Sequence, residues 1–226
     1  MPYGGMTWAG QRSRHRSGDI VTAMAFRGRA DAANRAAMTW QDTPERYGLV
    51  TRTLHWLMAA LFVWQFTGMA VRLTVGRAPI TSFMVGTHAP VGTLLLTLLV
   101  VRVVWAFASR RRRPPYEPGA PGLAARAGHV ALYALMLVVP TLALLRMYGS
   151  GRGFAPFGLP LFAPRPDRIE WMMAPANAVH GKLAWLLLAL IAGHVLAALW
   201  HRLVRRDAVL SRMAGPPRAA ASAAAR

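Results

Sequence analysis

The sequence predicts an all-α membrane protein, a bundle of four transmembrane helices. Of its 226 residues, 54% are hydrophobic and only 15% are charged, whereas soluble domains usually carry about a quarter charged residues. Four apolar segments reach the length of about 20 residues that a bilayer requires, and they cover residues 52–71, 86–107, 127–145 and 177–203. The short links between them favour a single bundle.

The arginines gather between the apolar segments, and their distribution predicts the orientation of the chain. Eight lie before the first span or at its start, five lie in the second link and six follow the fourth span, whereas the first link holds two. We therefore expect both termini in the cytoplasm. A net charge of +19 is also common in nucleic-acid-binding proteins, but arginines that only flank apolar spans form no basic groove. No nucleic-acid partner is expected.

The same pattern divides the chain into three parts. Residues 1–45 are polar and arginine-rich and are expected to form a disordered basic extension, residues 46–206 form the four-span domain, and residues 207–226 form a cytoplasmic basic tail. The third link is rich in glycine, proline and aromatic residues, and a structured loop or a short amphipathic segment capping the outer face is expected there. The sequence has no cysteine, which excludes disulfides, cysteine-ligated iron–sulfur clusters and covalent attachment of c-type haem.

Two histidines in the fourth span, His180 and His194, are the first candidate functional residues. Ionisable residues inside a membrane helix are rare and usually functional. Fourteen residues at 3.6 per turn return the chain to nearly the same face, about 21 Å further along the axis. The topology pairs His55 with His194 near the inner side of the membrane and His88 with His180 near the outer side. Neutral imidazole is a strong iron ligand, so the pattern predicts two haems, each between two histidines.

Alternative roles for these histidines fit the sequence less well. Zinc favours three or four ligands at one place, often cysteines or carboxylates, and a proton relay would use carboxylates within the membrane. The four apolar spans contain no aspartate, glutamate or cysteine. Both alternatives are therefore less favoured than haem ligation.

Three further residues are candidates for the surroundings of the haems. His129, at the inner start of the third span, is a rival ligand to His55. We expect His129 and His201 instead to contact a ligand histidine or a haem propionate. Arg102 lies deep in the second span, where it either extends to the cytoplasmic surface or pairs with a haem propionate.

Four motifs resemble those of the bacterial cytochrome b561 family. They are RYGLVTRTLHW, GTHAPVG, GHVALYALMLVVP and VHGKL…IAGH, and the resemblance extends over about residues 46–213. It implies that His55, His88, His180 and His194 hold two noncovalent b-type haems in a four-helix bundle. It also implies electron transfer across the bacterial inner membrane and exchange of electrons with quinone. The extension before Arg46 departs from the family pattern.

Several functional alternatives stay open at this stage. A cytochrome b subunit that anchors a larger respiratory hydrogenase or dehydrogenase would carry the same histidines, although four spans favour a cytochrome that works alone. A small transporter or structural membrane protein would bind no haem. The electron donor is unknown, and the chain could act as a homodimer or with a redox partner subunit. Basic residues around the outer side suggest that a quinone or a small anionic reductant reacts there.

Overall fold

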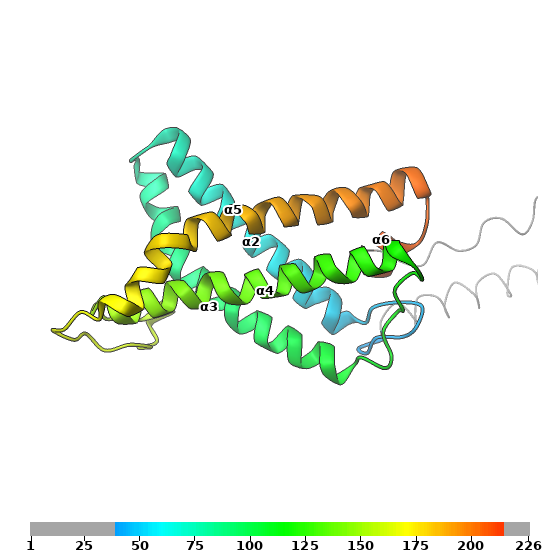
Figure 1. Ribbon diagram of the computed structural model, residues 1–226, viewed down its shortest axis with the longest axis horizontal. Coiled ribbons are helices and arrows are strands. Elements are labelled where there is room, and N and C mark those ends of the chain that lie inside the picture. The colour runs from blue at the N-terminus through cyan, green and yellow to red at the C-terminus, as the bar shows by residue number, and fades with distance from the viewer. Residues whose placement is uncertain (1–38, 215–226) are drawn as a thin grey trace, which may run out of the picture.

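The computed structural model describes residues 39–214 and confirms the expected fold class. Within this range the chain forms four long helices: α2 (Leu49–Val75), α3 (Pro79–Ala108), α4 (Ala120–Gly149) and α5 (Glu170–Trp200). All four are long and apolar enough to cross a membrane. Figure 1 shows α4 and α5 running along the long axis of the molecule, with α2 and α3 oblique to them. The described chain is therefore a four-helix transmembrane bundle.

The helices extend beyond the apolar segments that predict them. α3 and α4 each have 30 residues and α5 has 31. At 1.5 Å per residue, 30 residues span about 45 Å, the thickness of a bilayer with its headgroup regions. An apolar segment marks only the part of a helix that lies in the hydrocarbon core. The helix ends beyond it carry polar residues such as Arg126 and Glu170. The ends of the helices therefore lie in the headgroup regions.

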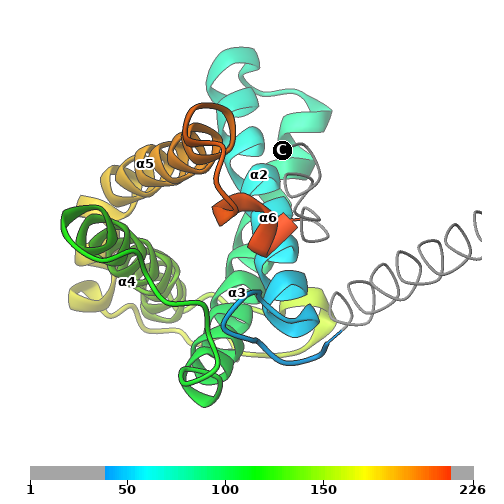
Figure 2. The same ribbon diagram turned by 90° about the vertical axis from the view of Figure 1, so that its right-hand side faces the viewer.

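The four helices pack in the order of the chain. α2 packs along α3, α3 packs against α4, and α4 packs along α5. The end view places α4 and α5 on one side and α2 and α3 on the other (Figure 2). The main apolar core lies between α2 and α3 and consists of Met58, Val91, Leu95 and Leu99. In α5 only Ala176 and Leu187 are buried, so the helix with two histidines is little covered by its neighbours.

The two ends of the bundle are named after the expected orientation: the end at which the described chain begins and ends is called the inner end, and the opposite end is called the outer end. The link between α4 and α5, at the outer end, is a structured loop. It contains a short 3₁₀ turn, η1 (Pro156–Gly158), and an isolated antiparallel bridge between Phe154 and Phe162. η1 contacts α3. The loop therefore connects the α4–α5 side of the bundle with α3 at the outer end.

At the inner end, the ordered structure extends before residue 46 and beyond residue 206, the boundaries expected for the four-span domain. The side chain of Asp42 is buried and accepts hydrogen bonds from the Gly48 backbone N–H (2.8 Å) and from Arg113 Nε (3.1 Å). After α5 the chain continues through a π-helical turn, η2 (His201–Arg205), into a short helix, α6 (Val209–Ala214). Long-range hydrogen bonds order both segments, and composition does not reveal such bonds. The rest of the expected extension and tail, residues 1–38 and 215–226, lies outside the described residues.

Candidate functional site

The structure brings the four membrane histidines together in the two expected pairs. At the inner end, the rings of His55 on α2 and His194 on α5 have centroids 6.2 Å apart and planes inclined at 64°. At the outer end, the rings of His88 on α3 and His180 on α5 have centroids 6.3 Å apart and planes inclined at 76°. α5 contributes one histidine to each pair because the fourteen-residue spacing keeps both on one side of the helix.

The separation within each pair fits two axial ligands of one iron. A bond from a first-row metal to an imidazole nitrogen is about 2.0 Å, and the ring centre lies about 1.1 Å beyond the nitrogen, so two opposite ligands place their centroids about 6.2 Å apart. Both observed separations agree with this value. Rings on opposite sides of the metal can rotate about the shared axis, so the inclination between their planes does not oppose the fit.

A zinc site of the usual kind is not found in the described part of the chain. Residues 39–214 contain no group of three or more histidine, cysteine, aspartate or glutamate side chains placed to hold a metal ion. The histidines meet in pairs, which suits a haem because the porphyrin itself supplies the other four iron ligands. The donor set therefore favours haem over a bare metal ion.

His180 has the partner expected of a ligand histidine. Its Nδ1 lies 3.1 Å from the backbone carbonyl oxygen of Val139 on α4. A carbonyl oxygen only accepts, so Nδ1 carries the proton and Nε2 keeps a free lone pair. Ligand histidines usually donate their second N–H in this way, which fixes the tautomer and the ring orientation.

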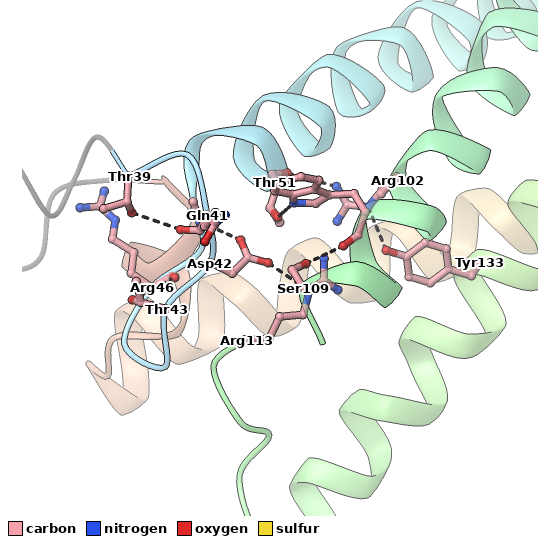
Figure 3. Close-up of polar contacts among 12 residues, drawn as sticks. Thr39, Gln41, Asp42, Thr43, Arg46, Thr51, Arg102, Ser109, Arg113 and Tyr133 are labelled. Atoms are coloured by element: carbon pink, nitrogen blue, oxygen red, sulfur yellow. Dashed lines mark hydrogen bonds and ion pairs between the residues drawn. The ribbon is translucent and has the colours of Figure 1, made fainter. Parts of the chain in front are cut away.

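Arg102 forms a polar cluster beside the inner pair (Figure 3). Its Nε donates to the hydroxyl of Tyr133 (2.9 Å), Nη1 lies 3.4 Å from the Thr51 carbonyl oxygen, and Nη2 lies 3.4 Å from His55 Nδ1. Trp105 donates its indole N–H to the Thr51 hydroxyl (2.9 Å). The guanidinium thus joins α2, α3 and α4 within the bundle, instead of extending to the surface.

His129 lies beside the inner pair, but its spacing does not suit a haem ligand opposite His194. The centroids of the His129 and His194 rings are 5.3 Å apart, shorter than the separation of about 6.2 Å that two axial ligands require. Its Nδ1 lies 3.2 Å from the hydroxyl of Tyr116 in the α3–α4 link. Burial raises the pKa of Tyr116, so this hydroxyl stays protonated at neutral pH. The His129 ring therefore contacts the ring of His194, a candidate ligand.

His201 pairs with an aspartate of the chain that follows α5. Its Nδ1 lies 2.6 Å from Asp207 Oδ2, so it takes part in the turn that follows α5. The sequence places His201 on the same face as His194 and provides no sign that the chain reverses after Arg205. The partner of His201 thus depends on a turn that hydropathy does not detect.

Gln65, in the middle of α2, was not singled out by the sequence reasoning. Its Nε2 donates to the backbone carbonyl of His88 (3.0 Å). On the same turn of α2, Trp64 Nε1 donates to the Thr87 hydroxyl (2.9 Å). These bonds hold α2 against the turn of α3 that carries His88. The polarity of Gln65 in an apolar span was the available signal, because such residues rarely occur without a partner.

Comparisons with known proteins agree with this architecture. Residues 46–216 match the family described as prokaryotic cytochrome b561. The chain is 33% identical over 190 residues to cytochrome b561 homolog 2 of Escherichia coli strain K12, an alignment that covers 79% of this chain and 96% of that protein. It is 27% identical over 175 residues to the probable superoxide oxidase CybB of Yersinia pestis, with 75% and 96% covered. It is 26% identical over 167 residues to cytochrome b561 homolog 1 of Escherichia coli strain K12, with 71% and 92% covered.

The matched region includes all four membrane helices and the four paired histidines. The match confirms the family resemblance that the sequence motifs indicate. It assigns the protein to multi-pass bacterial membrane cytochromes that bind b-type haem and take part in electron transfer. The chain belongs to the prokaryotic cytochrome b561 family.

Proposed function

We propose that the protein is a di-haem cytochrome b that carries electrons across the bacterial inner membrane and exchanges them with quinone. The observation that carries this proposal is the pair of histidine separations, 6.2 Å at the inner end and 6.3 Å at the outer end. His55 and His194 would hold one haem, and His88 and His180 would hold the other.

The bound haems would supply one-electron redox chemistry at both ends of the bundle. Because two histidines would be available to each iron, no position would stay open for oxygen binding, which favours electron transfer over oxygen activation. The chain's own residues would hold the ligand rings in place. Val139 orients His180, and Gln65 anchors the turn of His88. Two sites about 21 Å apart along α5 would let electrons pass from one membrane face to the other.

The arginine distribution supports cytoplasmic termini, with the His55/His194 pair on the inner side. The four spans of the domain favour a cytochrome that works alone over one that anchors a larger enzyme. A large catalytic subunit that copurifies with the protein would support the anchor alternative.

The test of the di-haem proposal is a pyridine-haemochrome assay on purified protein, combined with a redox titration of its absorption spectrum. Two haems per chain and two separate midpoint potentials are expected. One haem per chain would overturn the proposal. His55→Ala and His88→Ala variants assign the sites, because each should lose one haem and keep the other.

A second candidate function is oxidation of superoxide at the outer haem. One relative is named as a probable superoxide oxidase, and the observation that favours this activity here is the basic outer end. Seven basic and two acidic side chains lie around it: Arg72, Arg77, Arg146, Arg152, Arg165, Arg168 and Lys182 against Asp167 and Glu170. Such a field attracts small anions and speeds their encounter with the protein, an effect that salt weakens.

The structure identifies which outer arginines can be removed to test this candidate. Arg165 donates to the Tyr148 carbonyl (2.7 Å) and stacks on the Tyr148 ring, so it holds the loop together. Arg152 and Arg168 are exposed. We expect the Arg152→Ala/Arg168→Ala variant to lose much of the salt dependence of haem reduction by superoxide in stopped-flow experiments.

The matched control removes two charges at the inner end, in an Arg111→Ala/Arg202→Ala variant, because both of these side chains are exposed. Its salt dependence should equal that of the wild type. Equal salt dependence in the outer variant and the wild type would exclude steering of the anion by the outer end. Reduction by a neutral reductant should not respond to salt in any of these proteins.

A further inference from the structure

The chain after α5 crosses the inner end of the bundle and connects the two helices of the inner histidine pair. We define residues 201–214, comprising η2, the following turn and α6, as the carboxyl-terminal strap. In the end view the strap leaves α5 and ends over α2 (Figure 2). The principal packing contacts of the bundle join α2 to α3, α3 to α4 and α4 to α5. The strap thus joins the first and last helices of that series.

Two side chains of α2 bind the end of the strap. Arg52 Nε donates to the backbone carbonyl of Met213 (3.0 Å), and Trp56 Nε1 donates to the same oxygen (3.2 Å). The backbone N–H of Tyr47, just before α2, lies 3.3 Å from the Arg212 carbonyl oxygen. The Trp56 ring also contacts the His55 ring edge-on, with centroids 5.2 Å apart. The strap therefore ends on the turn of α2 that carries His55.

A specific turn begins the strap at the end of α5. Asp207 accepts from His201 Nδ1 (2.6 Å) and from the Val209 backbone N–H (3.1 Å), and the Asp207 N–H donates to the His201 carbonyl (3.1 Å). Arg206 adopts the left-handed conformation, with φ 52°. His201 follows His194 by seven residues, two helical turns or about 10 Å along the axis. The strap therefore begins close to the second histidine of the inner pair.

An ion pair ties this turn to the α3–α4 link. Arg205 makes two hydrogen bonds to the carboxylate of Glu117, at 2.7 and 2.9 Å, and its Nε lies 3.6 Å from Asp207. The bonds from Arg205 hold the pKa of Glu117 below its ordinary value, so the carboxylate is ionised at neutral pH. The turn is thus fixed by contacts with the end of α5 and with the α3–α4 link.

We propose that the carboxyl-terminal strap is a positioning element that sets the distance between α2 and α5 and thereby holds His55 and His194 at the spacing of two axial haem ligands. This inference rests on the proposed haem-binding function. Ligand constellations require side chains held to within about 0.5 Å by supporting contacts. At the outer end, His180 is held by Val139 and the turn of His88 by Gln65, whereas at the inner end the two ligand helices are joined through the strap.

The test compares two substitutions at Arg206, each of which removes the positive charge. Arg206 is exposed, so its replacement removes little packing. Asparagine tolerates the left-handed conformation, whereas a β-branched valine strongly disfavours it. Arg206→Asn should preserve the strap, and Arg206→Val should open it.

The first readout is the distance between α2 and α5, measured by pulsed electron paramagnetic resonance between nitroxide labels. The sequence contains no cysteine, so Leu57→Cys and Leu196→Cys introduce the only two labelling sites, both on exposed side chains. A narrow distance distribution is expected for the unsubstituted strap and for Arg206→Asn. A broader distribution with longer distances is expected for Arg206→Val.

The second readout is the haem content and the low-spin spectrum of each site. Arg206→Val should lose the haem of the inner pair and retain the outer haem, so that the ratio falls from two haems per chain to one. Arg206→Asn should keep both. Identical label distances and identical haem contents in the two variants would overturn the role of the strap.

If Arg206→Val does not accumulate in the membrane, a third variant, Trp56→Phe, tests the role of the strap. Trp56→Phe removes the indole N–H that binds the Met213 carbonyl and keeps an aromatic ring beside His55. A shift of the inner midpoint potential with an unchanged outer potential is expected, and no shift would overturn the proposal. A His55→Ala variant separates the two hypotheses. If it loses one haem while the strap variants lose none, only the strap is excluded; if it loses no haem, the proposed function itself fails.

Discussion

His180 and His55 meet partners of opposite hydrogen-bonding character. His180 Nδ1 faces the carbonyl oxygen of Val139, which only accepts, and His55 Nδ1 faces the guanidinium of Arg102, which only donates. The first contact leaves Nε2 of His180 free for a metal. The second makes Nδ1 of His55 an acceptor and places the proton on Nε2. Ligation of iron through Nε2 of His55 would therefore require Arg102 to turn away from the ring, towards Tyr133 and Thr51.

The geometry of the inner pair predicts different outcomes for two alanine variants. His129→Ala should keep two haems per chain, because the His129 ring lies too close to His194 for both to flank an iron, and its Nδ1 faces Tyr116. His55→Ala should keep one haem. A pyridine-haemochrome assay normalised to protein mass measures both. Equal haem loss in the two variants would show that the inner ligand is assigned wrongly.

The charge of Arg102 predicts a change in one midpoint potential. A positive charge near a haem favours the reduced state, and a unit charge about 10 Å away contributes about 1.7 kcal/mol at an effective dielectric constant near 20. Because about 59 mV corresponds to a tenfold change in a one-electron equilibrium, Arg102→Gln should lower one potential by several tens of millivolts and leave the other unchanged. A redox titration followed by absorption spectroscopy measures both potentials.

Tyr133→Phe is the matched control for the charge of Arg102. It removes the hydroxyl that accepts from Arg102 Nε and leaves the guanidinium charge in place. The potentials should stay close to those of the wild type, and stability should fall by about 1 kcal/mol for one lost hydrogen bond. If Arg102→Gln shifts neither potential, Arg102 is not electrostatically coupled to the inner site.

α4 and α5 approach each other closely at Gly149, the last residue of α4. A Cβ atom at Gly149 would lie 2.7 Å from Met172 Cβ and 3.0 Å from the Ile169 carbonyl oxygen. The Ile169 N–H donates to the Gly149 carbonyl (2.8 Å), which ties the start of α5 to the end of α4. The close approach at this glycine sets the position from which α5 carries His180 into the bundle.

This contact predicts a position-specific effect of a single methyl group. Gly149→Ala should destabilise the protein by about 1–3 kcal/mol, because α4 and α5 must separate to accommodate the added atom. Gly86→Ala adds the same methyl group within α3, where a Cβ would meet nothing within 4 Å, and should be neutral or stabilising because alanine favours a helix. Thermal unfolding in detergent measures both. A Gly149→Ala variant as stable as Gly86→Ala would contradict the close contact.

The two ends of the whole molecule differ in how they are held. The inner end is joined by the Asp42 contacts, the Arg205–Glu117 ion pair and the carboxyl-terminal strap. The outer end is closed by the loop of residues 150–169, whose tip exposes apolar side chains such as Phe157 and Leu159. More arginines lie at the inner end than at the outer end, which is the distribution expected of an inner end that faces the cytoplasm.

The orientation can be tested with single cysteines in the cysteine-free chain. Leu159→Cys in the outer loop and Arg111→Cys in the α3–α4 link both replace exposed residues. In intact spheroplasts, a membrane-impermeant maleimide should label Leu159→Cys and leave Arg111→Cys unlabelled until the membrane is opened. Labelling of Arg111→Cys alone in intact spheroplasts would invert the topology and exchange the inner and outer histidine pairs.

The sequence by itself determined the number of spans and the pairing of the four histidines. Both depend on local quantities: the length of an apolar segment must match the bilayer, and the fourteen-residue spacing returns α5 to one face whatever its neighbours are. The charge pattern of the links predicts an orientation, which the labelling experiment tests. Such features can be predicted without knowledge of any tertiary contact.

Only the tertiary structure decided which groups support those histidines. Tyr133 meets Arg102 across 31 residues, Val139 meets His180 across 41 and Met213 meets Trp56 across 157. Hydropathy separates apolar segments from polar ones, and it cannot show that a polar terminus reverses at Arg206 or that His201 turns to Asp207. Such contacts depend on the three-dimensional path of the chain, because their partners come from elements that are distant in the sequence.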